Sequence, residues 1–263
     1  MRLCLGTANY NKHYGINKFK IKKDSIKKIL KFSEKKNFKY LDTAFNYNNY
    51  QNLPKNKYFE IITKVNKLRD FNINKIETEI INQINPVYKK SRQLYAILLH
   101  DCDDMRSKKS KEIFQSLLNL KKKKITKKIG ISCYHEKDLN ILKLYDFDIV
   151  QFPLNIFDQR LLKKKNLKKI KDKEIHIRSI FLQGLLIDEN FKKIRYFSKW
   201  KSKFQKLEKY LKNKKTTSLE ACIFFVKKFK FVKMAVVGVN NLNQLKLLSS
   251  IMTKKNKDSL NFK

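Results

Sequence analysis

Four side chains that can carry acid–base chemistry follow one another in the first part of the chain. They are Asp42 and Tyr47 in "KYLDTAFNYNNY", Lys64 in "ITK" and His100 in "LLH". A tyrosine is a proton donor whose pKa of about 10 falls by roughly 1 to 3 units beside a cation. A lysine could supply that cation, and a carboxylate would offset the cost of burying it. With a histidine donating a hydrogen bond, the set could protonate an oxygen that gains negative charge.

Short β-rich apolar segments alternate with longer amphipathic segments along the chain. We expect strands at residues 2–8, 39–44, 59–65, 94–100, 127–133, 148–154, 175–181 and 232–238. Helical spacing of apolar residues predicts helices at 24–36, 74–84, 110–124 and 136–145. Eight alternations indicate a protein of the α/β class, a (β/α)8 TIM barrel. Because no Gly-, Ser- or Pro-rich linker divides the chain, we expect residues 1–263 to form one domain.

A barrel of this kind would bring the candidate residues together. The carboxyl ends of its strands meet at the face where active sites lie. Asp42, Lys64 and His100 would stand at the ends of the second, third and fourth strands and point into the barrel mouth, since side chains alternate along a strand. Tyr47 would fold over the same mouth. A solvated lysine or a structural histidine is the commoner interpretation of each residue alone, but three successive strand ends favour a site.

The charge of the chain raises the question of a polyanionic partner. The chain has 62 Lys and Arg against 23 Asp and Glu, which gives a net charge of +39 at pH 7. The lysines run through the whole chain, as in "KKKKITKK" and "LLKKKNLKKIKDKE". This is the pattern of solvated helix faces, without one basic stripe interleaved with aromatics. We expect no specific nucleic-acid partner, and a basic nucleic-acid-binding protein stays as an alternative.

Other features of the sequence predict a cytoplasmic protein without a membrane span. No apolar run approaches the roughly 18 residues of a transmembrane helix, and "MRLCLGTANY" lacks the features of a signal peptide. Cys4, Cys102, Cys133 and Cys222 are scattered and form no CxxC pair. We interpret them as reduced thiols and predict no metal site.

Several motifs resemble those of one family. "DTAFNY", "ITK" and "LLH" resemble the Asp, Tyr, Lys and His tetrad of the aldo-keto reductases. The resemblance continues through "LGTANYNKHYG", "IGISCY", "VQFPLN", "FLQGLL" and "VVGVNNLNQL", nearly to the end of the chain. It implies a barrel that binds an extended nicotinamide dinucleotide without a Rossmann domain, and the absence of a GxGxxG motif agrees with that.

The resemblance also implies a set of cofactor-binding residues. These are Gly6 and Thr7 in the opening strand and loop, Ser132 and Gln151 at the nicotinamide carboxamide, Gln183, Gly184 and Leu185 at the pyrophosphate, and Gly238, Asn240, Asn241 and Gln244 near the adenosine phosphate. Arg178 stands where many members place an aromatic that stacks on the nicotinamide, and its guanidinium plane could take that role. We expect NADP; NAD stays open because Asn240 and Asn241 replace the basic or hydroxyl side chains that often grip the 2′-phosphate.

The function that follows is reduction of an aldehyde or ketone to an alcohol, with Tyr47 as general acid assisted by Lys64, Asp42 and His100. The chain ends soon after "VVGVNN", which predicts an open mouth. An open mouth suits a bulky or polar substrate such as a sugar or sugar-nucleotide carbonyl, and the basic surface favours an anionic one. The alternative is a catalytically silent barrel that binds nicotinamide as a regulatory or structural subunit. The oligomeric state stays open.

Overall fold

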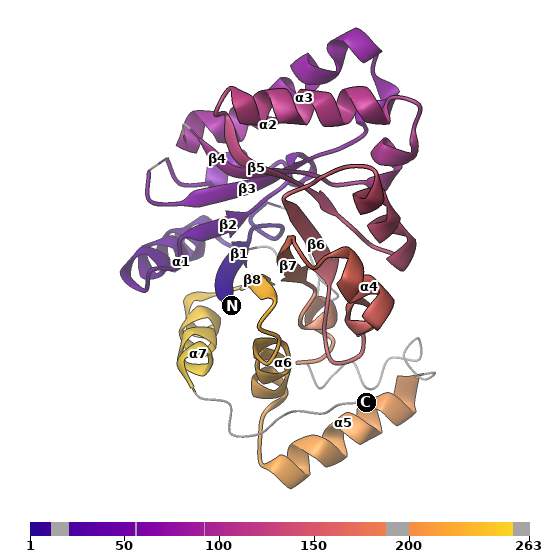
Figure 1. The fold of residues 1–263 in the computed structure, drawn as a ribbon. Coiled ribbons are helices and arrows are strands. Elements are labelled where there is room, and N and C mark those ends of the chain that lie inside the picture. Colours follow the sequence, from indigo (N-terminus) through magenta and orange to yellow (C-terminus); the bar gives the residue numbers. More distant parts are fainter. Residues whose placement is uncertain (12–20, 56, 92, 188–199, 255–263) are drawn as a thin grey trace.

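A closed barrel of parallel strands forms the centre of the molecule (Figure 1). The computed structural model describes residues 1–11, 21–55, 57–91, 93–187 and 200–254. Within these residues the eight strands are β1 (Arg2–Gly6), β2 (Tyr40–Asp42), β3 (Glu60–Val65), β4 (Leu94–Leu99), β5 (Thr126–Ser132), β6 (Ile149–Pro153), β7 (Glu174–Arg178) and β8 (Val232–Gly238). β1 pairs with β8 from Arg2↔Met234 to Gly6↔Gly238, which closes the barrel. The predicted (β/α)8 architecture is confirmed.

Helices surround the barrel and connect its strands. They are α1 (Lys23–Lys35), α2 (Ile76–Ser91), α3 (Ser110–Lys122), α4 (Lys164–Lys169), α5 (Lys201–Lys214), α6 (Ser218–Lys227) and α7 (Leu242–Thr253). α2 packs against β3, α3 packs against β5, and the two helices lie side by side (Figure 1). α5 lies at the outside of the molecule, farther from the strands than α6 (Figure 1).

Two predicted helices differ from the structure. The helix expected at 74–84 continues as α2 through Pro86 to Ser91, because Val87 is buried beyond the proline and anchors the last turns. The segment expected as a helix at 136–145 is a 3₁₀ helix at Glu136–Lys143. Its first turn is fixed by the buried Asp138 carboxylate, which accepts hydrogen bonds of 2.7 Å from the backbone N–H groups of Tyr134 and His135.

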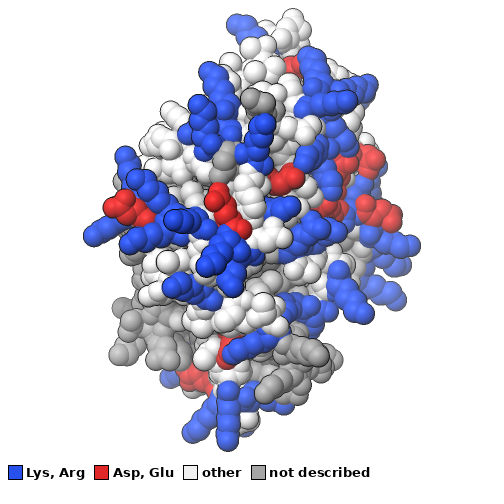
Figure 2. All heavy atoms as spheres, turned by 90° about the vertical axis from the view of Figure 1, so that its left-hand side faces the viewer, with Lys and Arg blue, Asp and Glu red and all other residues white. Residues whose placement is uncertain are grey.

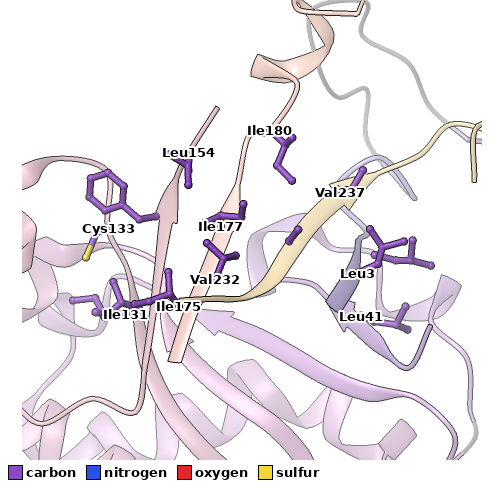
Figure 3. Packing of buried hydrophobic residues seen from close by; sticks show 14 of the residues in the cluster. Leu3, Leu41, Ile131, Cys133, Leu154, Ile175, Ile177, Ile180, Val232 and Val237 are labelled. Carbon is purple, nitrogen blue, oxygen red and sulfur yellow. The ribbon is translucent and has the colours of Figure 1, made fainter. Parts of the chain in front are cut away.

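Two hydrophobic clusters explain why the strand segments are so apolar. One lies between the barrel and the helices; Leu3, Leu41, Ile131, Ile177 and Val237 belong to it (Figure 3). The other fills the barrel interior and contains Cys4, Tyr40, Ile62, Tyr95, Ala96, Leu98, Ile149 and Met234. With both faces covered, the strands read as nearly continuous hydrophobic runs. Since side chains alternate, residues two positions beyond the interior ones also point into the barrel.

Gly130 is required by the packing of the barrel interior. A Cβ at this position of β5 would lie 2.5 Å from Leu98 Cδ2 and 2.6 Å from the Ile149 carbonyl oxygen. Real Cβ contacts do not come so close, so glycine allows the neighbouring side chains to fill the barrel.

Charged side chains cover the surface without forming one basic stripe on the face that Figure 2 shows. Lys and Arg spread over the height of this face with Asp and Glu between them (Figure 2). Several lysines are paired: Lys127 Nζ lies 2.9 Å from Glu60 Oε1, and Lys123 Nζ lies 2.6 Å from Glu77 Oε1. No helix within the described ranges is long and apolar enough to cross a membrane.

Candidate active site

The ends of several strands enclose a cavity of about 820 Å³. Asp42 is the last residue of β2, Lys64 is the last but one of β3, and His100 directly follows β4; all three line the cavity. Tyr47, from the 3₁₀ helix Phe45–Tyr47 after β2, lines it as well. The four side chains predicted from the sequence to be catalytic therefore lie together at the carboxyl end of the barrel.

Asp42 and Lys64 form a buried ion pair. Lys64 Nζ donates to Asp42 Oδ1 and, over 3.1 Å, to the Thr43 carbonyl oxygen. Asp42 Oδ2 accepts a 2.9 Å hydrogen bond from Gln151 Nε2. Only 3% of Asp42 and 2% of Lys64 is exposed. The pair offsets the cost of burying either charge and holds an ammonium group at a fixed position in the cavity wall.

Tyr47 is a neighbour of both this ammonium group and His100. Lys64 Nζ is 5.7 Å from the centroid of the Tyr47 ring. The ring of His100 meets the Tyr47 ring edge to face, with centroids 6.0 Å apart and an interplanar angle of 83°. Tyr47 is half-buried. Its phenol therefore stands in a wall that contains a fixed cation and an imidazole.

His100 is neutral at physiological pH. Burial in the cavity wall, together with the positive charge of Lys64, lowers the pKa of His100 from 6.5 to about 4. Its backbone N–H donates to the Val65 carbonyl oxygen over 2.8 Å, which ties the residue to β3. A neutral imidazole has one N–H, so His100 can donate a hydrogen bond without adding a charge to the cavity.

The loop that carries Tyr47 is held by Asn49, a residue that the sequence analysis missed. Asn49 is buried; its Nδ2 donates to the Thr7 carbonyl oxygen over 2.6 Å and to Thr7 Oγ1 over 3.0 Å. Its Oδ1 accepts from Thr43 Oγ1 over 3.0 Å. In the sequence Asn49 is one of several asparagines of a polar loop, and the partner that buries it is 42 positions away.

Ser132 and Gln151 line the cavity on adjacent strands. They are register partners of β5 and β6, and both are fully buried. Ser132 Oγ and Gln151 Oε1 have no hydrogen-bond partner among the described residues. A hydroxyl can donate and an amide oxygen can accept, so the two atoms complement a primary carboxamide. The nicotinamide carboxamide expected from the sequence fits this part of the cavity.

Most other residues expected to bind a cofactor line the same cavity: Gly6, Thr7, Arg178, Gln183, Gly184, Gly238, Asn240 and Gln244. Gly184 has a φ of +100°, and a Cβ there would have no heavy atom within 4 Å, so its backbone is open to a ligand. Leu185 and Asn241 do not line the cavity. Leu185 is buried in the hydrophobic core, and Asn241 caps α7 by accepting from the Gln244 N–H over 2.9 Å.

The β8 loop is tied to the β1 loop by Asn9, which the sequence analysis also missed. Asn9 Nδ2 donates to the Val239 carbonyl oxygen over 3.1 Å and to Asn240 Oδ1 over 2.8 Å. The Asn240 N–H donates to Gln244 Oε1 over 2.7 Å. Asn240 is therefore held in place at the cavity on both its backbone and its side chain.

Arg178, the last residue of β7, stacks on Tyr134. Its Cζ lies 4.1 Å from the centroid of the Tyr134 ring, and its Nη2 donates to the Cys133 carbonyl oxygen over 3.0 Å. Tyr134 lines the cavity and was not proposed from the sequence.

The described residues contain no cluster of three or more His, Cys, Asp or Glu side chains that could hold a metal ion.

Comparisons with known proteins identify a matching family and similar structures. Residues 2–260 match the model of the aldo/keto reductase family. The structure is similar to the holo form of an aldo-keto reductase from Bacillus halodurans, with 16% identity over 98% of this chain and 88% of that one and a TM-score of 0.73. It is also similar to a candidate aldo-keto reductase from Pseudomonas aeruginosa, with 15% identity over 95% and 88% of the two chains and a TM-score of 0.68. A search of curated proteins gave no significant match.

At these identities the structural likeness shows the fold, while the family match spans nearly the whole chain. The protein is an NAD(P)-dependent oxidoreductase built on a (β/α)8 barrel. It belongs to the aldo-keto reductase family.

Proposed function

We propose that this chain reduces an aldehyde or ketone to an alcohol, with Tyr47 donating the proton that the carbonyl oxygen receives. The observation that carries this proposal is the buried Asp42–Lys64 ion pair beside the Tyr47 ring, with His100 on the same cavity. A buried ammonium group at this place stabilises the phenolate that remains when the tyrosine gives up its proton.

Each side chain has one task in this proposal. Lys64 supplies the positive charge, and Asp42 holds Lys64 in position with the help of the Thr43 carbonyl oxygen. His100, neutral because of its lowered pKa, donates a hydrogen bond that orients the carbonyl oxygen toward Tyr47. Asn49 keeps the Tyr47 loop against β1.

The same cavity has room for the cofactor that the family uses. When bound, a reduced nicotinamide dinucleotide supplies the hydride. Ser132 and Gln151 would hold its carboxamide, because their two unpartnered polar atoms are a donor and an acceptor. Gln183 and Gly184 would lie along the pyrophosphate, and Asn240 near the adenosine phosphate, with Gly6, Thr7, Gly238 and Gln244 completing the wall. Leu185 and Asn241 would contribute through the scaffold only.

We further propose that the cofactor is NADP, with Asn240 at the 2′-phosphate. The general positive charge of the chain would attract this phosphate too, but such attraction is screened within roughly 8 Å at physiological salt. The dissociation constants of NADPH and NADH at low and high salt separate the two contributions. If Asn240 contacts the 2′-phosphate, the preference for NADPH over NADH should persist at high salt. Asn240→Asp should reverse this preference, and the control Asn74→Asp, outside the cavity, should retain it. A preference that vanishes with salt and ignores Asn240→Asp would contradict this assignment.

The substrate that we propose is a small polar carbonyl compound, either carbohydrate-derived or anionic. The cavity is partly open, and of its charged side chains Lys64 and Arg178 are cations while Asp42 is an anion. Comparing kcat/KM for glyceraldehyde, benzaldehyde and 4-carboxybenzaldehyde tests this. We expect the polar or carboxylated aldehydes to exceed benzaldehyde; a clear preference for benzaldehyde would contradict the proposal.

We propose that the protein acts in the cytoplasm. All four cysteines are free and buried, which supports activity in a reducing compartment.

The experiment that tests the function as a whole is a spectrophotometric assay of NADPH and NADH oxidation with this aldehyde panel. Aldehyde-dependent oxidation of either cofactor is the expected result. Cofactor binding without turnover of any aldehyde would favour a catalytically silent barrel.

A further inference from the structure

Arg178 brings a second cation to the cavity and is held there rigidly. Its guanidinium group stacks on the Tyr134 ring at 4.1 Å and donates to the Cys133 carbonyl oxygen over 3.0 Å. Its Nε is buried and has no hydrogen-bond partner within the described part of the chain. Both contacts come from the residues that directly follow β5, so the position of the group is fixed by the barrel itself.

Arg178 has no acidic partner among the residues that the structure describes. Lys64 is paired with Asp42, whereas no described carboxylate lies within ion-pair distance of Arg178. Asp42 is also the only acidic residue among those that line the cavity in the described structure. With His100 neutral and Lys64 balanced by Asp42, the described residues of the cavity wall carry one excess positive charge, that of Arg178.

Arg178 lies beside the place where the carboxamide fits. Ser132 and Gln151 are partners in β5 and β6, and Gln151 pairs with His176 in β7. Arg178 lies two residues beyond His176 on β7. Because side chains alternate along a strand, the Arg178 side chain points to the same side as that of His176 and lies nearer the cavity mouth. Arg178 and His100 line the same cavity, and the charge of Arg178 adds to the effects of burial and of Lys64, which lower the pKa of His100.

We propose that Arg178 makes the cavity discriminate between the two redox states of the nicotinamide ring, by disfavouring the oxidised one. This inference rests on the proposed function. The oxidised ring carries a positive charge and the reduced ring carries none, so a fixed cation beside the ring raises the free energy of the oxidised complex only. The Arg178 guanidinium thus favours loading of the reduced cofactor and release of the oxidised one, a step that often limits turnover in enzymes.

The test compares the dissociation constants of NADPH and NADP⁺ in four proteins. These are the wild type, Arg178→Gln, Arg178→Lys and the control Lys233→Gln, which removes one charge from an exposed position of β8. NADPH is titrated by its own fluorescence and NADP⁺ by competition. We expect the ratio of the NADP⁺ to the NADPH constant to fall about tenfold in Arg178→Gln and to stay within twofold in the other variants. NADP⁺ and NADPH both carry the 2′-phosphate, so its contribution cancels in the ratio of their dissociation constants. The ratio of the NAD⁺ to the NADH constant should therefore fall by the same factor in Arg178→Gln.

The variants also separate charge from shape. If Arg178→Gln weakened both cofactor forms equally, Arg178 would be a packing element and the inference would be wrong. If Arg178→Lys changed the ratio as much as Arg178→Gln, the flat stacking surface would matter in place of the charge, which would also overturn it. Failure of the wild type to bind any of the four dinucleotides would refute the proposed function itself. Circular dichroism and the thermal unfolding midpoint confirm that each variant is folded.

Discussion

Replacing Lys64 by methionine would leave the Asp42 carboxylate buried without its cation. Asp42 is 3% exposed and would retain the hydrogen bond from Gln151. Removing one partner of a buried ion pair costs about 3–5 kcal/mol, because the other charge cannot regain its hydration. We expect Lys64→Met to lower the free energy of unfolding by this amount, and Asp42→Leu to do the same.

The double variant should behave differently. Replacing both charges by apolar side chains of similar volume is often neutral or stabilising, so Asp42→Leu with Lys64→Met should regain most of the lost stability. The coupling energy should therefore be about 3 kcal/mol or more, well above the roughly 0.5 kcal/mol by which independent sites depart from additivity. Activity should stay lost in all three variants. Lys64→Met and the double variant lack the ammonium group beside Tyr47, and Asp42→Leu removes the carboxylate that holds this group in position.

Urea denaturation followed by fluorescence and circular dichroism measures these stabilities, and cofactor oxidation measures the activity. Lys127→Met is the matched control: it breaks the surface pair between Lys127 and Glu60 and should cost less than about 1 kcal/mol. A double variant as unstable as the sum of the two single variants would refute the coupling of Asp42 to Lys64. Substantial activity in the double variant would refute the role of the ammonium group.

Two further predictions concern His100 and Asn49. The pKa of His100 lies at about 4, so the imidazole stays neutral down to about pH 5. We therefore expect that protonation of His100 causes no fall of kcat/KM for reduction between pH 8 and 5. A fall of kcat/KM near pH 6.5 that is present in the wild type and absent in His100→Asn would contradict the assignment. Asn49→Ala should lower kcat about tenfold or more by loosening the Tyr47 loop while leaving the dissociation constant of NADPH within about threefold, and an unchanged kcat would show that the loop is held without it.

The sequence predicted the barrel because its local signals agreed. Each strand is covered on both sides, so its apolar run is conspicuous, and the intervening helices show clear amphipathic spacing. The differences arose where tertiary contacts decide local structure. α2 continues past Pro86 because Val87 finds a buried place, and the 3₁₀ helix at Glu136–Lys143 follows the binding of Asp138 to two backbone N–H groups.

The candidate site divides in the same way. Asp42, Lys64 and His100 were predictable because each stands at or next to the end of an apolar strand. Asn49 and Asn9 were not, since their partners lie 42 and about 230 positions away and a buried asparagine has no local signature. The cation–π contact of Arg178 with Tyr134 likewise joins the ends of β5 and β7, which lie on either side of β6, and periodicity alone cannot predict a contact across that strand.

The most direct test of the account is the rate of cofactor oxidation by Tyr47→Phe, which keeps the ring and removes only the proton donor. With a saturating aldehyde and NADPH, we expect turnover to fall by about 10²- to 10⁴-fold, or roughly 3 to 5 kcal/mol in the barrier. The dissociation constant of NADPH should stay unchanged, because the carboxamide would be held by Ser132 and Gln151. Turnover within a few-fold of the wild type would contradict the assignment of Tyr47 as the acid.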